Sequence, residues 1–188
     1  MILSPAEAQT LLTAAREAIT AHLEHRTPVL PEATGALAEP CGAFVTLRIG
    51  RTLRGCIGSI TAVRPLLETV ERMAVESAFH DPRFAPLSAL ELGRIAIELS
   101  VLSPLRQIES IEEIVPGTHG IYLRYGSRSG LLLPQVAEEH GWDRETFLRN
   151  TCYKAGLMSE CWQDPRIEIF IFTAEIFTEP DRTESHRA

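Results

Sequence analysis

The sequence has almost no lysine, few aromatic residues and no long apolar run. Aromatic residues make up 6% of the 188 residues, and Lys154 is the single lysine beside seventeen arginines. No stretch of about 18 apolar residues is present, which excludes a transmembrane helix. The N-terminus lacks the basic start and apolar segment of a secretory signal, so we expect a cytoplasmic protein with no membrane association. Because ammonium and guanidinium groups differ in shape and pKa, Lys154 is a candidate ligand-binding residue.

The sequence also lacks the motifs of common metal and cofactor sites. The four cysteines, Cys41, Cys56, Cys152 and Cys161, show no C-x-x-C spacing, which argues against a zinc knuckle or a thioredoxin-like pair. In a reducing compartment we expect all four to be free thiols. No Gly-rich loop of the dinucleotide or phosphate-binding type is present. No metal site and no cofactor is therefore indicated.

The charge is negative overall but unevenly distributed. The net charge of −7 argues against nonspecific nucleic-acid binding. No acidic residue lies in 40–67 or in 114–137. These two intervals hold basic side chains and one histidine, namely Arg48, Arg51, Arg54, Arg64, His119, Arg124 and Arg128. The pattern indicates a site for an anion, or else outward-facing side chains of two hairpins.

The hydrophobic pattern predicts one globular domain of the α+β class. The chain is 45% apolar and 23% charged, which is ordinary for a single core of this size. Helical spacing and caps predict helices at 5–25, 65–80, 135–140 and 143–155. Strands are predicted at 42–49, 52–60, 95–102, 121–125, 130–134 and 166–177. Because helices and strands do not alternate and several strand pairs are tightly joined, we expect a mostly antiparallel sheet flanked by helices.

The segment Leu-Arg-Gly-Cys-Ile-Gly-Ser at 53–59 is the strongest candidate for chemistry. Gly55 and Gly58 allow a sharp turn or a close backbone approach, and they leave the thiol of Cys56 poorly covered. Arg54 precedes Cys56 by two residues, so a regular strand places both on one face. A nearby cation favours the thiolate, which is the nucleophilic form. Cys56 is therefore a candidate nucleophile or thiol ligand, and the alternative is a small packing residue.

Five further positions carry polar groups in informative places. His119, in a glycine-flanked turn, is a candidate base or proton donor, or else it caps the turn. Gln135, at a predicted helix start, presents its amide to a ligand or to the backbone. Asp81 and Arg83 are expected to form an ion pair or an Asx turn with a structural role. Glu98, in an apolar strand, is expected on the solvent face.

Several ordered blocks of the sequence resemble the AMMECR domain family. They are residues 41–47, 53–58, 81–87, 117–120, 132–137, 147–148 and 152–157, with Trp162. The resemblance covers about residues 6–179, and residues 126–130 depart from the family pattern. It implies one domain over 1–179 with a larger and a smaller subdomain, and with the Arg-Gly-Cys-Ile-Gly segment in a cleft. Residues 180–188 are expected to be a disordered tail.

The resemblance also implies partners. Bacterial single-domain members of this family are associated with a Memo-like protein and a radical SAM enzyme, the AmmeMemoRadiSam system. Our first hypothesis is a component of such a system that acts on a small anionic or modified substrate. The second is a noncatalytic adaptor that binds a partner segment, and nucleic-acid binding is a weaker third. The predicted site residues are Cys56 and His119 for chemistry, with Arg54, Gly55, Gly58, Gln135 and Lys154 for binding.

Overall fold

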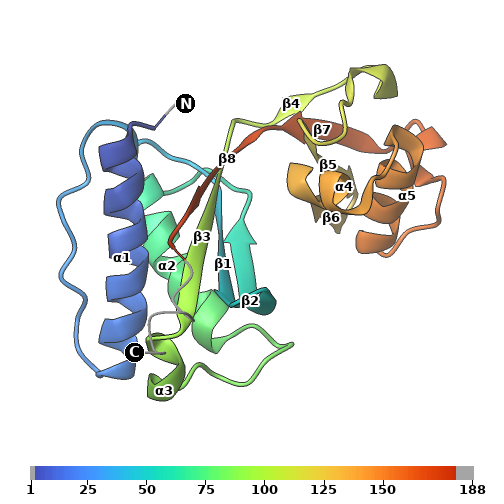
Figure 1. The fold of residues 1–188 in the computed structure, drawn as a ribbon. Coiled ribbons are helices and arrows are strands. Elements are labelled where there is room, and N and C mark those ends of the chain that lie inside the picture. The colour runs from blue at the N-terminus through green and yellow to red at the C-terminus, as the bar shows by residue number, and fades with distance from the viewer. Residues whose placement is uncertain (1–2, 181–188) are drawn as a thin grey trace. The chain divides into compact units, whose positions relative to one another are not determined.

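The computed structural model describes residues 3–180 and divides the chain into two compact units (Figure 1). The first unit runs to Leu102 and resumes at Glu175, and the second comprises Ser103–Ala174. They correspond to the predicted larger and smaller subdomains, and the α+β class is confirmed. Of the predicted tail, residues 181–188 lie outside the described residues.

The first unit contains a four-stranded sheet in the order β2-β1-β3-β8. Its strands are β1 (Ala43–Ile49), β2 (Thr52–Ser59), β3 (Ile95–Leu102) and β8 (Ala174–Thr178). β1 pairs antiparallel with both β2 and β3. The central position of β1 means that its side chains have neighbours on both sides.

Helices α1 (Pro5–Leu23) and α2 (Leu66–Phe79) lie on the same face of this sheet, as Figure 1 shows. The short elements η1 (Gly35–Ala38) and α3 (Ala89–Leu92) complete the unit. α1 begins with the predicted capping box between Ser4 and Glu7. The core between helices and sheet is aliphatic and includes Leu11, Ile19, Val45, Leu47, Leu66, Val70, Ile97 and Leu99.

The second unit contains another four-stranded sheet, in the order β4-β7-β5-β6. Its strands are β4 (Arg106–Gln107), β5 (Gly120–Tyr125), β6 (Arg128–Leu132) and β7 (Glu168–Phe172). Its helices are η2 (Ile111–Glu113), α4 (Pro134–His140), α5 (Arg144–Lys154) and η3 (Cys161–Gln163). Their apolar side chains form a separate core around Ile114, Ile121, Phe147, Leu148 and Ile171. Each unit therefore has its own sheet and its own core.

Two predictions from the sequence are wrong. The apolar run at 166–177 is not one strand, because the chain leaves β7 after Phe172 and enters the other sheet at Ala174. Periodicity cannot reveal such a change of sheet when both halves are apolar. The four cysteines are not all free, since Cys152 and Cys161 form a disulfide with Cα atoms 6.0 Å apart. The last turn of α5 and η3 bring together two residues that a C-x-x-C search does not pair.

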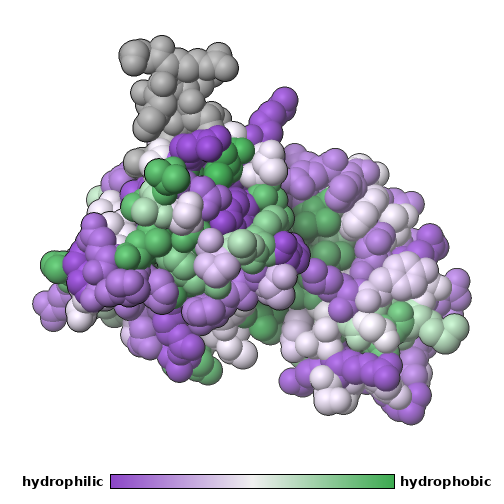
Figure 2. Space-filling view, turned by 90° about the horizontal axis from the view of Figure 1, so that it is seen from below, coloured by the Kyte–Doolittle hydropathy of each residue, from purple (hydrophilic) through white to green (hydrophobic). Residues whose placement is uncertain are grey.

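The surface mixes polar and apolar side chains. On the face drawn in Figure 2, hydrophobic residues are interspersed with hydrophilic ones. The exposed large hydrophobic residues belong to separate elements, for example Val29, Leu90 and Met158. Within residues 3–180, no helix combines the length and the apolar character needed to cross a membrane.

Candidate functional site

The strand that carries Cys56 contains a β-bulge. Thr46 and Leu47 of β1 pair with Cys56 and Gly55, but Arg48 pairs with Leu53, so the register skips Arg54. A bulge breaks the alternation of side chains along a strand. Simple alternation therefore does not hold between Arg54 and Cys56, and the expectation that they share a face stays a prediction.

Both glycines of the motif are required by internal packing. A Cβ atom at Gly55 would lie 2.1 Å from the carbonyl oxygen of Ser77 in α2. A Cβ atom at Gly58 would lie 2.2 Å from the ring of Phe44 in β1. The predicted close approaches at these glycines are present. Helix α2 approaches Gly55, and the Phe44 ring approaches Gly58. A role of either glycine in substrate binding stays a prediction.

Asp81 and Arg83 hold the main chain of Cys56 from both sides. The N–H of Cys56 donates to Asp81 Oδ2 (2.9 Å), and Arg83 Nη2 donates to the Cys56 carbonyl (3.1 Å). Arg83 also pairs with Asp81, and its own N–H closes the predicted Asx turn at 3.1 Å. The hydrogen bonds from Arg83 hold the pKa of the buried Asp81 carboxyl far below its usual range, against the opposing effect of desolvation. The predicted structural pair is confirmed, and its task is to fix Cys56.

Ser77 of α2 supplies a second attachment for this segment. Its hydroxyl donates to the carbonyl of Val45 (2.7 Å) and accepts the N–H of Ile57 (2.9 Å). Ser77 is 1% exposed, so its hydroxyl is a buried link from α2 to the directly paired residues Val45 and Ile57 of β1 and β2. The residue after Cys56 is thereby tied to both β1 and α2.

Arg54 is engaged in structural contacts. Its guanidinium pairs with Glu91 (2.7 Å) and donates to the carbonyl of Ala85 (2.9 Å). Arg54 and Arg83 lie over the ring of Phe84, at 5.9 and 5.4 Å from its centroid. The hydrogen bond from Arg54 lowers the pKa of Glu91 to about 2. The Arg54 charge is therefore largely balanced within the unit, and its predicted role toward a substrate stays a prediction.

The thiol of Cys56 is free and half-buried. The hydroxyl of Thr46, which is 5% exposed, donates to Cys56 Sγ at 3.3 Å. Cys41 offers a contrast, because it is buried and its thiol donates to the carbonyl of Leu102 (3.1 Å). Burial raises the pKa of the Cys41 thiol. Of the four cysteines, all within the described chain, Cys56 combines a free thiol with partial exposure and a hydroxyl donor.

A row of polar side chains crosses the sheet at Cys56. Thr46 is directly opposite Cys56 in β2 and directly opposite Glu98 in β3, so the three share one face. Val45 and Leu47, which alternate with Thr46, are fully buried in the core with the helices. We call the side away from these helices the Thr46 face. Glu98 lies on this face and is half-buried, while Thr46 beside it is buried, so the expected solvent exposure of Glu98 stays a prediction.

Sequence reasoning missed Thr46 and the alignment of Glu98 with Cys56. The signal for Thr46 was present, since polar residues at 46 and 48 alternate with the apolar residues of a predicted strand. The alignment of Glu98 with Cys56 could not be predicted from the sequence, because it depends on the register of three strands and on the bulge.

The other predicted site residues lie in the second unit. His119 Nδ1 accepts the N–H of Val115 at 3.1 Å, which closes the turn before β5. Gln135 is half-buried in the first turn of α4, and its Oε1 atom is buried. Lys154 is exposed at the end of α5, where a cation interacts favourably with the helix dipole. The predicted pairing of His119 with Cys56 stays a prediction, because the two residues belong to different compact units.

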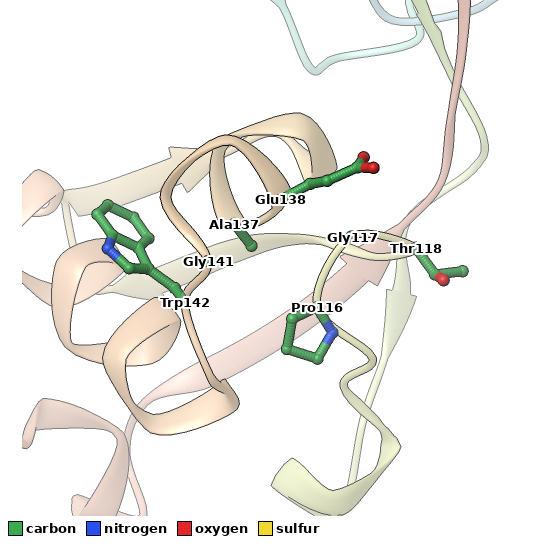
Figure 3. Close-up of a pocket in the computed structure, with 7 residues that line it drawn as sticks. All are labelled: Pro116, Gly117, Thr118, Ala137, Glu138, Gly141 and Trp142. Carbon is green, nitrogen blue, oxygen red and sulfur yellow. The ribbon is translucent and has the colours of Figure 1, made fainter.

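A cavity of about 430 Å³ lies beside the His119 turn (Figure 3). The residues that line it are Pro116, Gly117, Thr118, Ala137, Glu138, Gly141 and Trp142. In Figure 3 the Thr118 and Glu138 side chains extend to one side and the Trp142 indole to the other. Main chain and small side chains therefore surround its middle. Among residues 3–180, no three His, Cys, Asp or Glu side chains are grouped as metal ligands.

Comparisons with known proteins agree on one family. The AMMECR1 family model matches residues 12–177. The protein MK0488 of Methanopyrus kandleri is 42% identical over 185 residues, which cover 93% of this chain and 89% of that protein. The crystal structure of the uncharacterized protein PH0010 from Pyrococcus horikoshii has a TM-score of 0.90 at 40% identity and covers 96% of this chain and 95% of that one. The chain therefore belongs to the AMMECR1 family.

Proposed function

We propose that this protein is an AmmeMemoRadiSam-type component that uses the thiol of Cys56 in chemistry on a small molecule. Its site would lie on the Thr46 face, with Thr46 orienting the sulfur and Glu98 as the nearest carboxylate of the row. A Memo-like protein and a radical SAM enzyme would supply or consume the small molecule. The observation that carries the proposal is the fixation of Cys56 through its backbone, which leaves its thiol free.

The contacts around Cys56 support a site for chemistry. Asp81, Arg83 and Ser77 hold the backbone at Cys56 and Ile57 without engaging the thiol. The Thr46 hydroxyl places a hydrogen-bond donor 3.3 Å from the sulfur and so orients it. A cysteine that served packing alone would resemble Cys41, which is buried.

The rate of alkylation by iodoacetamide, followed by mass spectrometry of each cysteine against pH, tests this proposal. We expect Cys56 to react faster than Cys41 in the native protein between about pH 6 and pH 9, a range that brackets ordinary thiol titration. Thr46→Val should slow Cys56 at neutral pH, whereas Thr46→Ser, which keeps the hydroxyl, should restore the rate. A Cys56 thiol that stays inert until the protein unfolds would overturn the proposal.

A noncatalytic adaptor is the second candidate. It is favoured by the internal contacts of Arg54, Gly55 and Gly58, which show that much of the motif maintains the fold. Binding of a purified Memo-like protein by wild type and by Cys56→Ser separates the two functions. Unchanged binding together with an unreactive Cys56 thiol would favour the adaptor.

A further inference from the structure

Two side chains of opposite charge, Arg48 and Glu98, lie on the Thr46 face together with Cys56. Arg48 follows Thr46 by two residues in β1, so it lies on the same face, and it pairs with Ala96 of β3. Glu98 is two residues beyond Ala96, which makes Arg48 and Glu98 diagonal neighbours across β1 and β3. Such neighbours are separated by about 7–8 Å. The cation, the carboxylate and the thiol are therefore within the span of one small molecule.

Arg48 and Glu98 have no charged partner in the part of the chain that the structure describes. Within residues 3–180, neither Arg48 nor Glu98 takes part in an ion pair or a side-chain hydrogen bond. Both are half-buried. By contrast, Arg54 and Arg83, which lie close by, are each paired with a carboxylate. A partly desolvated charge is costly unless it has a partner, so a ligand that supplies both partners would be stabilised here.

We infer that the Thr46 face binds a small zwitterionic molecule of the amino-acid type beside Cys56. Its carboxylate or other oxyanion pairs with the guanidinium of Arg48, which suits two-point contact with such groups. Its ammonium group pairs with Glu98. This inference rests on the proposed function, since it names the substrate class of the same thiol site. It also moves the predicted anion recognition from Arg54 to Arg48.

Thiosulfonate reagents of different charge test this arrangement in the full-length protein. The Cys56 thiolate attacks the sulfenyl sulfur of a methanethiosulfonate, a disulfide forms, and methanesulfinate leaves. Three reagents are compared at low salt: the anionic sulfonatoethyl, the cationic trimethylammonioethyl and the neutral methyl compound. The readout is the rate for each charged reagent divided by the rate for the neutral one, which cancels general changes in thiol reactivity.

We expect Arg48→Gln to lower the anionic-to-neutral ratio and Glu98→Gln to lower the cationic-to-neutral ratio. Glu98 lies two strands from Cys56 and Arg48 lies on the neighbouring strand, so the separations are about 7–10 Å. One unit charge at such a distance in water corresponds to a factor of about two to three, and about 0.15 M salt should reduce it. Arg48→Lys should keep the anionic preference, which separates charge from folding effects. Arg51→Gln and Glu32→Gln, at exposed positions of the same unit, are the matched controls and should leave both ratios unchanged.

The outcomes separate this inference from the proposed function. A fall of about two- to threefold in the anionic ratio of Arg48→Gln and in the cationic ratio of Glu98→Gln supports binding of a zwitterion. A change in one ratio alone means a site for ions of one sign and overturns it, as does no change while Cys56 still reacts. No reaction with any of the three reagents overturns the proposed function and this inference together.

Discussion

The tripeptide Asp-Pro-Arg occurs twice, and the two copies form the same local turn. Arg83 donates its N–H to Asp81 Oδ1 at 3.1 Å, and Arg166 donates to Asp164 Oδ1 at 2.9 Å. In both turns Nη2 lies 2.6 Å from Oδ2. Both guanidiniums also lie over an aromatic ring, that of Phe84 or of Tyr125.

What differs is the surroundings of the two turns. The side chain of Asp81 is 2% exposed and that of Asp164 is 32% exposed. The first turn holds the Cys56 backbone. The second closes the segment after Cys161, which is fixed covalently through its disulfide. One cysteine is therefore held by hydrogen bonds that leave its sulfur free, and the other is held by its sulfur. A local motif determines a turn, and tertiary packing determines its use.

The largest loss of stability is expected when β2, the strand beside the first turn, is pushed away from α2. Gly55→Ala places a Cβ atom 2.1 Å from the Ser77 carbonyl, and neither backbone can move easily. We expect the free energy of unfolding to fall by about 3 kcal/mol or more. Denaturant unfolding measures it, with Gly93→Ala as control, because Gly93 is exposed at φ −72°, which alanine adopts readily. A Gly55→Ala protein of wild-type stability would contradict the close packing of β2 on α2.

Asp81→Asn tests most directly whether the first turn stabilises the protein more than the second. This variant removes the charge that pairs with Arg83 and weakens the contact with the Cys56 N–H, so we expect a loss of about 2–3 kcal/mol of unfolding free energy. Asp164→Asn is the matched variant and should lose much less, because its turn is exposed and holds no other strand. Equal losses in the two variants would mean that the shared local turn, and not its setting, accounts for the stability.

The stabilising effect of Asp81 should also depend on pH. The pKa of Asp81 is depressed in the folded protein, so its stabilising contribution is complete above the unfolded pKa of about 4. The contribution is lost as the pH falls below that value toward the folded pKa. The stability difference between wild type and Asp81→Asn should therefore be constant above about pH 5 and shrink below about pH 4. Thermal unfolding at a series of pH values measures it, and a constant difference down to about pH 2 would contradict the assigned shift.

A smaller loss of stability than in Gly55→Ala or Asp81→Asn is expected when the disulfide of the second unit is removed. Cys161→Ser removes the disulfide to Cys152, which closes a loop with a sequence separation of 9. A short loop of this kind contributes about 2 kcal/mol through restriction of the unfolded chain. Wild type treated with a reductant should match Cys161→Ser, and Cys56 alkylation should be unaffected in both. A variant as stable as the oxidised wild type would show that the disulfide does not stabilise this segment.

Local sequence predicted most elements because capping boxes, helical spacing and turn glycines act over a few residues. The Ser4–Glu7 cap, the hairpin of β5 and β6, and the Asp81–Arg83 pair follow from such signals. The bulge at Arg54 did not, since it is visible only in the pairing of β2 with β1. Nor did the row from Cys56 through Thr46 to Glu98, which joins three strands. Cys56 could be recognised from the glycines on either side of it. Its neighbours Thr46 and Glu98 could not, because they are placed beside it only by the register of the strands.

The change of sheet at Thr173 has a consequence for the order in which the chain folds. β8 is the outermost strand next to β3 in the first sheet, yet residues 103–173 separate it from that strand in the sequence. Phe177 packs on the first core, and Arg16 of α1 pairs with Glu179 just beyond β8. During synthesis from the N-terminus, the unit that carries Cys56 is therefore begun first and completed last. Its final strand is added after the whole second unit has been made, so truncation near the C-terminus would expose the edge of β3 in the first sheet.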